Sequence, residues 1–180
     1  GFYPIKRMPA LVRAFGSVAR RHPNAMLRVC GDGEQRALVE QAIRDAGVGD
    51  KVVLLGKASF DVVEREVRCS DVFALTPVND TFPTVHLEAA ALGRPQVWTS
   101  GGAICDYLKD GVHGYQVDAK SEESIAEGLG RLLADAAARE KMGLACRRLF
   151  EEELSWDVVA PRLVGVYREV VREAGALPGP

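Results

Sequence analysis

The segment 79–88 carries the strongest signal for chemistry in the chain. A loop is predicted to end here and a helix to begin, so the N–H groups of Thr84 and Val85 lack acceptors within the helix. The helix dipole adds partial positive charge at the same point. Such a helix start suits a diphosphate. The carboxylates of Asp80 and Glu88 flank it in the sequence.

Glu88 lies about one and a half turns into the predicted helix over 83–92. A carboxylate at that depth cannot cap the helix. It can accept hydrogen bonds from two adjacent hydroxyls, which a ribose offers. A solvated surface acid explains the pattern equally well, so both roles of Glu88 stay open at this point.

Strand and helix patterns alternate around this segment. Short apolar runs predict strands, and amphipathic stretches predict helices. The strands are 26–30, 52–55, 72–76, 96–99 and 115–117, and the helices are 9–21, 34–46, 60–68, 83–92, 104–109, 122–134, 137–152 and 156–174. This order predicts an α/β fold, a Rossmann-like parallel sheet with helices on both faces. Ligands of such sheets bind beyond the carboxyl ends of the strands, which points to the loops 31–33, 56–59, 77–82 and 99–106.

The composition is that of one globular domain. The chain has 180 residues, of which 47% are hydrophobic, and its net charge is −2. A nucleic-acid-binding protein would carry a basic footprint, so we expect no nucleic-acid partner. We expect residues 1–174 to form the domain and residues 175–180 to fray.

The four cysteines form no C-x-x-C pair, and no histidine lies at ligand spacing from any of them. Neither a zinc site nor a disulfide framework is therefore expected. We expect no other metal and no cofactor. No signal peptide is evident and no apolar run reaches membrane-spanning length, so we expect a cytoplasmic protein.

Motifs along nearly the whole chain resemble those of glycosyl transferases group 1, a retaining family of GT-B fold. Residues 80–95 resemble its E-x7-E signature, which continues as E-A-x-A-x-G-x-P. The further matches are 6–15 with K-[RG]-x-x-x-L-[IVL]-x-A-F, 27–33 with L-x-[IV]-x-G-D-G, 52–56 with V-x-F-L-G, 102–114 with the GG-x-P-E and D-G-x-N-G run, and 154–156 with F-S-W.

The resemblance implies an enzyme of two facing Rossmann-like domains with the active site between them. This chain resembles only the C-terminal domain, which binds the nucleotide sugar. The implied reaction transfers a hexosyl group from a nucleoside-diphosphate sugar to an acceptor hydroxyl, with retention and without a metal ion. The base stays open among UDP, GDP and ADP. The missing N-terminal acceptor domain would be its partner, and the fragment alone would be inactive. Peripheral association of the full-length enzyme with the inner face of a membrane is left open.

The same resemblance assigns roles to individual residues. Lys6 would neutralise the diphosphate, Asp80 would face the donor sugar, and Glu88 would hold the ribose; these three form the expected catalytic set. The other expected donor-binding positions are Gly31, Gly33, Gly56, Lys57, Phe82, and the helix-start residues Thr84 and Val85.

Some residues depart from the family pattern. Asp80 and Asp106 each replace a Glu, and Cys105 replaces a Pro. Asp80 therefore carries its carboxylate one methylene closer to the backbone, which leaves the sugar contact and the donor identity open. The arginine usually found shortly before Lys6 is absent, with Gly1 at about that place.

The sequence also allows three alternative interpretations. The Gly31-x-Gly33 pair follows a strand as in a dinucleotide-binding fingerprint, but Arg36 stands where the third glycine would pack. A non-catalytic binding or regulatory module of the same fold is the second alternative, because fold does not fix function. A sugar-nucleotide epimerase of GT-B fold is the third.

Four conspicuous side chains have simpler interpretations. His86 lies between Val85 and Leu87, which favours packing or a surface role. His113 occupies a turn where the family usually has Asn. Trp98 and Trp156 fit core or interface positions better than sugar platforms.

Overall fold

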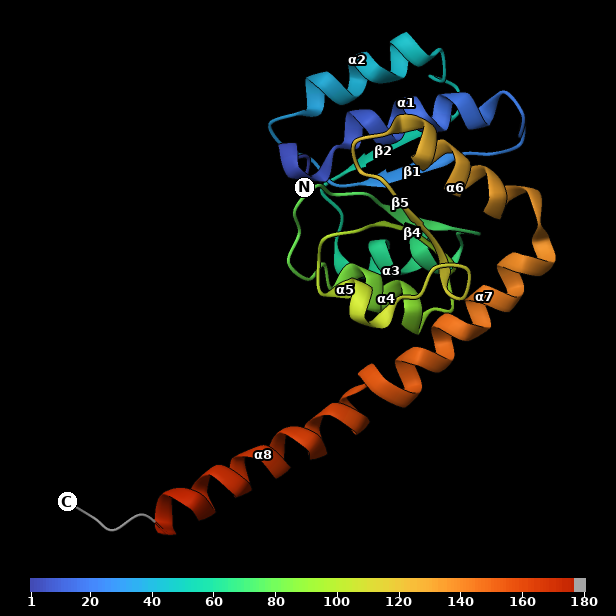
Figure 1. The fold of residues 1–180 in the computed structure, drawn as a ribbon. Helices are drawn as coiled ribbons and strands as arrows, with labels where there is room; N and C mark the ends of the chain where they lie inside the picture. The colour runs from blue at the N-terminus through green and yellow to red at the C-terminus, as the bar shows by residue number, and fades with distance from the viewer. Residues whose placement is uncertain (177–180) are drawn as a thin grey trace.

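The computed structural model describes residues 1–176 (Figure 1). Its strands are β1 (Leu27–Cys30), β2 (Val52–Gly56), β3 (Phe73–Leu75), β4 (Gln96–Thr99) and β5 (Gly114–Val117). Its helical segments are η1 (Pro4–Lys6), α1 (Met8–Ala19), α2 (Arg36–Ala46), α3 (Phe60–Arg68), α4 (Val85–Ala91), α5 (Ile104–Tyr107), α6 (Glu122–Ala134), α7 (Ala136–Leu149), η2 (Phe150–Leu154) and α8 (Trp156–Ala176). Within the tail expected over 175–180, residues 177–180 lie outside the described part of the chain.

All strand pairs in the described residues are parallel. β1 pairs with β2, and the order β3-β4-β5 forms a second hydrogen-bonded group. Helices α1, α2 and α6 lie on one side of the strands, and α3, α4 and α5 lie on the other (Figure 1). The predicted α/β fold with helices on both faces is therefore confirmed. The division of the strands into two hydrogen-bonded groups was not predicted, because periodicity does not fix strand order.

Two apolar clusters hold the layers together. The larger one joins α1 and α6 to the strands; its fully or almost fully buried members include Leu11, Val12, Phe15, Val29, Val97 and Ile125. The smaller one surrounds Trp98, with Ile104, Leu108 and Leu149. Each such side chain contributes about 1.5–3 kcal/mol when fully buried. Every residue of β4 is buried, so the loop that follows β4 rises from a rigid base.

Gly114 allows β5 to lie against β4. Its φ of 141° is unfavourable for other residues, and a Cβ there would lie 1.8 Å from the Gln96 carbonyl oxygen. This close approach explains why the Asp110–Gly114 turn ends in glycine, and it fixes β4 from the side opposite β3.

Several predicted boundaries were wrong by one to three residues. The prediction placed Pro83 in the first turn of a helix over 83–92, whereas α4 begins at Val85 with Thr84 as its N-cap. The N–H of His86 donates to the Pro83 carbonyl at 3.0 Å, so a tight turn precedes α4. The helix predicted over 137–152 ends at Leu149 and gives way to the wide π-type turn η2. The ends of helices fray or tighten into narrower turns, so the residue types near an end predict its exact position poorly.

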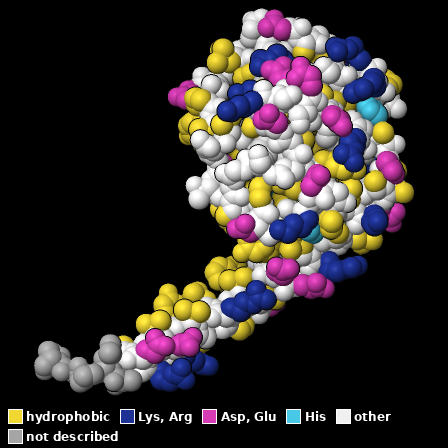
Figure 2. All heavy atoms as spheres, viewed as in Figure 1, with side chains coloured by type: hydrophobic (Ala, Val, Ile, Leu, Met, Phe, Trp, Pro, Cys, Tyr) yellow, Lys and Arg dark blue, Asp and Glu magenta, His cyan; other side chains and the backbone are white. Residues whose placement is uncertain are grey.

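Helix α8 projects from the rest of the molecule (Figure 1). Apolar side chains lie exposed along it, as Figure 2 shows. They are Trp156, Leu163, Val164, Val166, Tyr167, Val170 and Val171. Trp156 is 75% exposed, so it is no core residue in this structure. Within the described residues, no helix combines the length and apolarity that crossing a membrane requires.

Candidate functional site

Lys6 and Asp80 meet although 74 positions separate them. Lys6 ends η1, Asp80 lies in the loop after β3, and the Lys6 ammonium donates to the Asp80 carboxylate as an ion pair. The N–H of Val78 donates to the Ile5 carbonyl at 2.9 Å and ties the same two segments together. The structure thus places the predicted diphosphate cation and the predicted sugar-facing acid side by side.

Arg7 gives the chain the turn that presents Lys6. Its φ of 49° and ψ of 36° lie in the left-handed region, and it is both the C-cap of η1 and the N-cap of α1. Within residues 1–176 it is the one non-glycine residue with positive φ. Such a conformation costs roughly 1–3 kcal/mol and tends to occur at functional sites. The sequence around Arg7 does not predict this left-handed conformation.

The start of α4 leaves two amides free. The N–H groups of Leu87 and Glu88 both donate to the Thr84 carbonyl, at 2.8 and 3.2 Å. Thr84 and Val85 donate to no backbone acceptor in the described part of the chain. Thr84 is exposed and Val85 is half-buried, and both directly follow the loop that carries Asp80.

Glu88 is half-buried and unpaired. Its carboxylate has no hydrogen bond and no ion pair with any residue that the structure describes. It lies three residues after Val85 and four after Thr84, so it shares their face of α4. A carboxylate that is partly removed from water and has no partner is unfavourable unless something else compensates its charge. The environment of Glu88 therefore favours a ligand-binding role over that of a solvated surface acid.

The loops after β1 and β2 also meet. The N–H of Gly31 donates to the Gly56 carbonyl at 2.7 Å, and both glycines have positive φ, 139° and 69°. Lys57 follows Gly56 and is exposed. Gly33 has a packing reason of its own, since a Cβ there would lie 2.9 Å from the Phe2 nitrogen. The structure therefore joins Gly31 to Gly56 and turns Gly33 toward Phe2.

Phe82 is half-buried and packs on the smaller apolar cluster. Its ring meets that of Tyr107 edge to face, with centroids 6.1 Å apart. This contact anchors the loop that carries Asp80. A contact between Phe82 and a donor stays a prediction.

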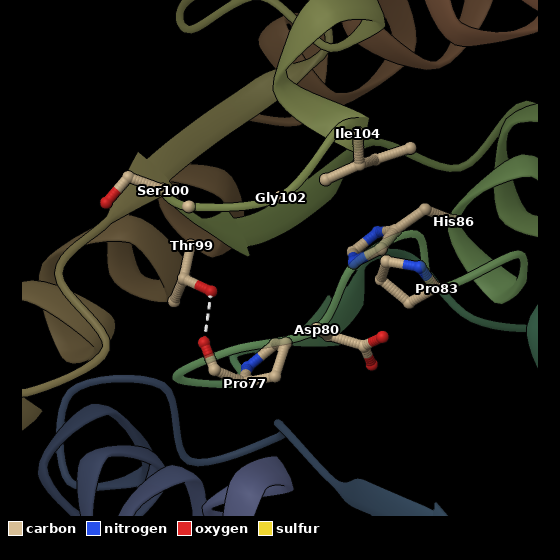
Figure 3. A pocket seen from close by; sticks show the side chains of 9 residues that line it. Pro77, Asp80, Pro83, His86, Thr99, Ser100, Gly102 and Ile104 are labelled. Carbon is tan, nitrogen blue, oxygen red and sulfur yellow. Dashed lines mark hydrogen bonds between the residues drawn. The ribbon is translucent and has the colours of Figure 1, made fainter.

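A small pocket opens beside Asp80, between the loop after β3 and the loop after β4 (Figure 3). It is lined by Pro77, Asp80, Pro83, His86, Thr99, Ser100, Gly101, Gly102 and Ile104. The Thr99 hydroxyl donates to the Pro77 carbonyl at 2.5 Å and links the two loops. The sequence interpretation missed His86 here, because helical spacing alone does not show which face of a short helix lines a pocket.

Among residues 1–176, no three His, Cys, Asp or Glu side chains come together as a metal site would need. The four cysteines are free thiols. Burial raises the pKa of the Cys146 thiol to about 12, so that thiol is an unreactive core group at neutral pH.

The family model described as glycosyl transferases group 1 matches residues 2–148. The chain belongs to this family. An uncharacterized glycosyltransferase of Methanocaldococcus jannaschii is 34% identical over 94% of the chain and 43% of its own length. The D-inositol 3-phosphate glycosyltransferase of Salinispora tropica is 32% identical over 94% of the chain and 37% of its own length. The chain thus spans less than half the length of these two glycosyltransferases.

Solved structures show the same fold. Sucrose-phosphate synthase from Thermosynechococcus elongatus superposes with a TM-score of 0.84 at 21% identity, over 96% of this chain and 44% of that one. The C-terminal domain of a group 1 glycosyl transferase from Francisella tularensis gives 0.75 at 24% identity, over 82% and 79%. The fold is therefore that of the C-terminal domain of a GT-B glycosyltransferase.

Proposed function

We propose that this domain binds a nucleoside-diphosphate hexose and takes part in transfer of the hexosyl group, with retention, to an acceptor hydroxyl. The observation that carries the proposal is the meeting of Lys6 and Asp80 beside the free amides of Thr84 and Val85. Acceptor binding belongs to the part of the family's enzymes that this chain does not span. The 180-residue chain alone should therefore bind donor and form no glycoside.

The chemistry follows from charge. Cleavage of the bond between the anomeric carbon and the diphosphate oxygen leaves negative charge on the departing nucleoside diphosphate. The Lys6 ammonium and the amides at the start of α4 stabilise that charge as it develops. Asp80 holds Lys6 in the free protein and faces the sugar when the donor is bound. Glu88, further along the same face of α4, accepts hydrogen bonds from the ribose hydroxyls.

Relatives support a nucleoside-diphosphate donor. The Anabaena protein HepE, solved in complex with UDP and glucose, superposes with a TM-score of 0.79 at 18% identity, over 98% of this chain and 46% of that one. A mannosyltransferase of Mycobacterium tuberculosis, 28% identical over 92% of this chain and 45% of its own length, is GDP-mannose-dependent. UDP and GDP are accordingly the first probes.

The test is calorimetric titration of the chain with UDP, GDP and ADP. We expect at least one of them to bind, with the same affinity when EDTA is present, because Lys6 and the amides supply the positive charge. The Lys6→Met variant should bind that nucleotide about 10- to 100-fold more weakly, since a hydrogen bond to a charged group contributes roughly 1.5–3 kcal/mol.

Lys51→Met is the matched control. The Lys51 ammonium donates to the Pro23 carbonyl, and Lys51 precedes β2 whereas Gly56 and Lys57 lie at the other end of that strand. This variant should bind like the wild type. Wild-type affinity in Lys6→Met, or loss of binding in EDTA that Mg²⁺ restores, would show that the proposed diphosphate site is wrong.

Asp80→Asn should separate sugar from nucleotide. The substitution frees Lys6 and removes a negative charge near the diphosphate, so affinity for the free nucleoside diphosphate should stay equal or rise. Affinity for the intact nucleotide sugar should fall relative to it, because a sugar contact is lost. Titration of both ligands gives the ratio. An unchanged ratio would mean that Asp80 does not contact the sugar.

A further inference from the structure

His86 is the buried histidine of α4, with 1% of its surface exposed. Its Nδ1 lies 2.6 Å from the Oε1 of Gln96, and the Gln96 Nε2 donates to the His86 carbonyl at 2.9 Å. That second bond fixes the orientation of the Gln96 amide, so Oε1 is the acceptor of the first. Nδ1 therefore carries the imidazole proton, and Nε2 presents a lone pair.

The Nε2 lone pair has no partner among the described residues, and the imidazole projects into the pocket beside Asp80 (Figure 3). The imidazole and the Phe73 ring pack edge to face, with centroids 5.4 Å apart and planes at 88°. Gln96 on one side and Phe73 on another thus hold the ring in place. Burial lowers the pKa of His86 to about 4, so Nε2 is an acceptor at neutral pH.

The loops after β3 and β4 contact each other at the side of the pocket that faces Gly102. A Cβ on Gly102 would lie 2.3 Å from the Asp80 carbonyl oxygen, and the N–H of Ala103 donates to the Thr81 carbonyl at 2.9 Å. The loops after β3 and β4 are therefore in direct contact. The space between them admits a small group only.

The side chains of Asp80 and His86 select the chemistry of that group. A carboxylate and a neutral imidazole nitrogen both accept hydrogen bonds, and the Asp80 carboxylate already accepts one from Lys6. A sugar hydroxyl donates one hydrogen bond and fits. The diphosphate belongs at Lys6 and the α4 amides, and the neighbouring pocket is left for the sugar.

We infer that His86 determines donor specificity, with its Nε2 accepting a hydrogen bond from one hydroxyl of the donor hexose in the pocket between Asp80 and Gly102. This inference rests on the proposed function. Gln96 is the positioning residue, since it holds the imidazole in the tautomer that exposes Nε2.

The test titrates UDP-glucose, UDP-N-acetylglucosamine and GDP-mannose, each beside its own nucleoside diphosphate. The sugar contribution is the ratio of the affinity for a nucleotide sugar to the affinity for its nucleoside diphosphate. The test uses the nucleotide sugar for which this ratio is largest. His86→Asn keeps an amide near the Nδ1 position, which can still donate to Gln96, but removes the acceptor at Nε2. It should reduce the sugar contribution about five- to tenfold and leave nucleoside diphosphate affinity unchanged. His86→Gln, which restores an acceptor near the Nε2 position, should recover part of the loss.

Monodeoxy forms of the same sugar nucleotide, titrated with the wild type, make the test independent of variant folding. One of them should lose about the same five- to tenfold, and that loss should vanish in His86→Asn. The inference is overturned if no hexose adds affinity, if every monodeoxy donor binds normally, or if His86→Asn weakens nucleotide and nucleotide sugar equally. Failure of all nucleoside diphosphates to bind would instead overturn the proposed function itself.

Discussion

Replacing Glu88 with Ala is expected to raise the dissociation constant of the bound nucleoside diphosphate about 30- to 1000-fold. The carboxylate has no partner within the described residues and lies on the face of α4 that carries the free amides. Two hydrogen bonds from a ribose to a charged group contribute roughly 1.5–3 kcal/mol each, reduced by partial solvation to about 2–4 kcal/mol in total. Calorimetry measures the change directly.

Two comparisons show whether Glu88 touches the ribose. A 2′,3′-dideoxy nucleotide should bind the wild type poorly and bind Glu88→Ala no worse than the parent nucleotide does, because contacting groups are not additive. Glu88→Gln should lose less than Glu88→Ala. Glu127→Ala, which removes an exposed acid of α6, should have no effect. Additive losses, or normal binding by a folded Glu88→Ala, would identify Glu88 as a surface acid.

Acidification from pH 6.5 to pH 4 is expected to remove about 3 kcal/mol of the free energy of unfolding through His86 alone. Burial lowers the folded-state pKa of His86 to about 4, whereas the unfolded chain titrates near 6.5. Between these values the unfolded state binds the extra proton, so stability rises with pH across the window and is lost as pH falls. Above about pH 7.5, where the unfolded chain is also neutral at this position, the contribution is constant.

Urea unfolding at closely spaced pH values checks this slope. Burial also lowers the pKa of His113, so it adds to the slope in the same direction. His86→Asn should be less stable at pH 7 but lose less stability on acidification, since only His113 and the carboxylates then titrate. Parallel pH curves for the wild type and His86→Asn would contradict a buried neutral His86.

Local sequence determined most elements of this fold. Alternating apolar runs and turn residues place β4, α3 and α6 at their observed bounds. The predicted start of α4 was wrong because Thr84, which follows Pro83, serves as the N-cap. Proline at the first helical position and proline in a preceding turn look alike in a sequence.

Less of the candidate site than of the fold could be predicted from the sequence. The residue types of Lys6, Asp80 and Glu88 were evident from the motifs, and the ion pair between Lys6 and Asp80 was not, because it joins segments far apart in the chain. His86 was interpreted as a packing or surface residue. Its burial is observed, but its orientation toward the pocket depends on Gln96 in the next strand, which no local pattern encodes.

The projection of α8 has a consequence for cooperativity. An isolated helix derives little stability from propensity alone, and α8 contains Pro161, Gly165 and several β-branched valines, which are weak helix formers. Its exposed apolar stripe contributes no burial within the described residues. Melting of α8 therefore exposes little new surface, and its amides can exchange with solvent without opening the core. We therefore expect α8 of the 180-residue chain to unfold as a separate unit of low stability.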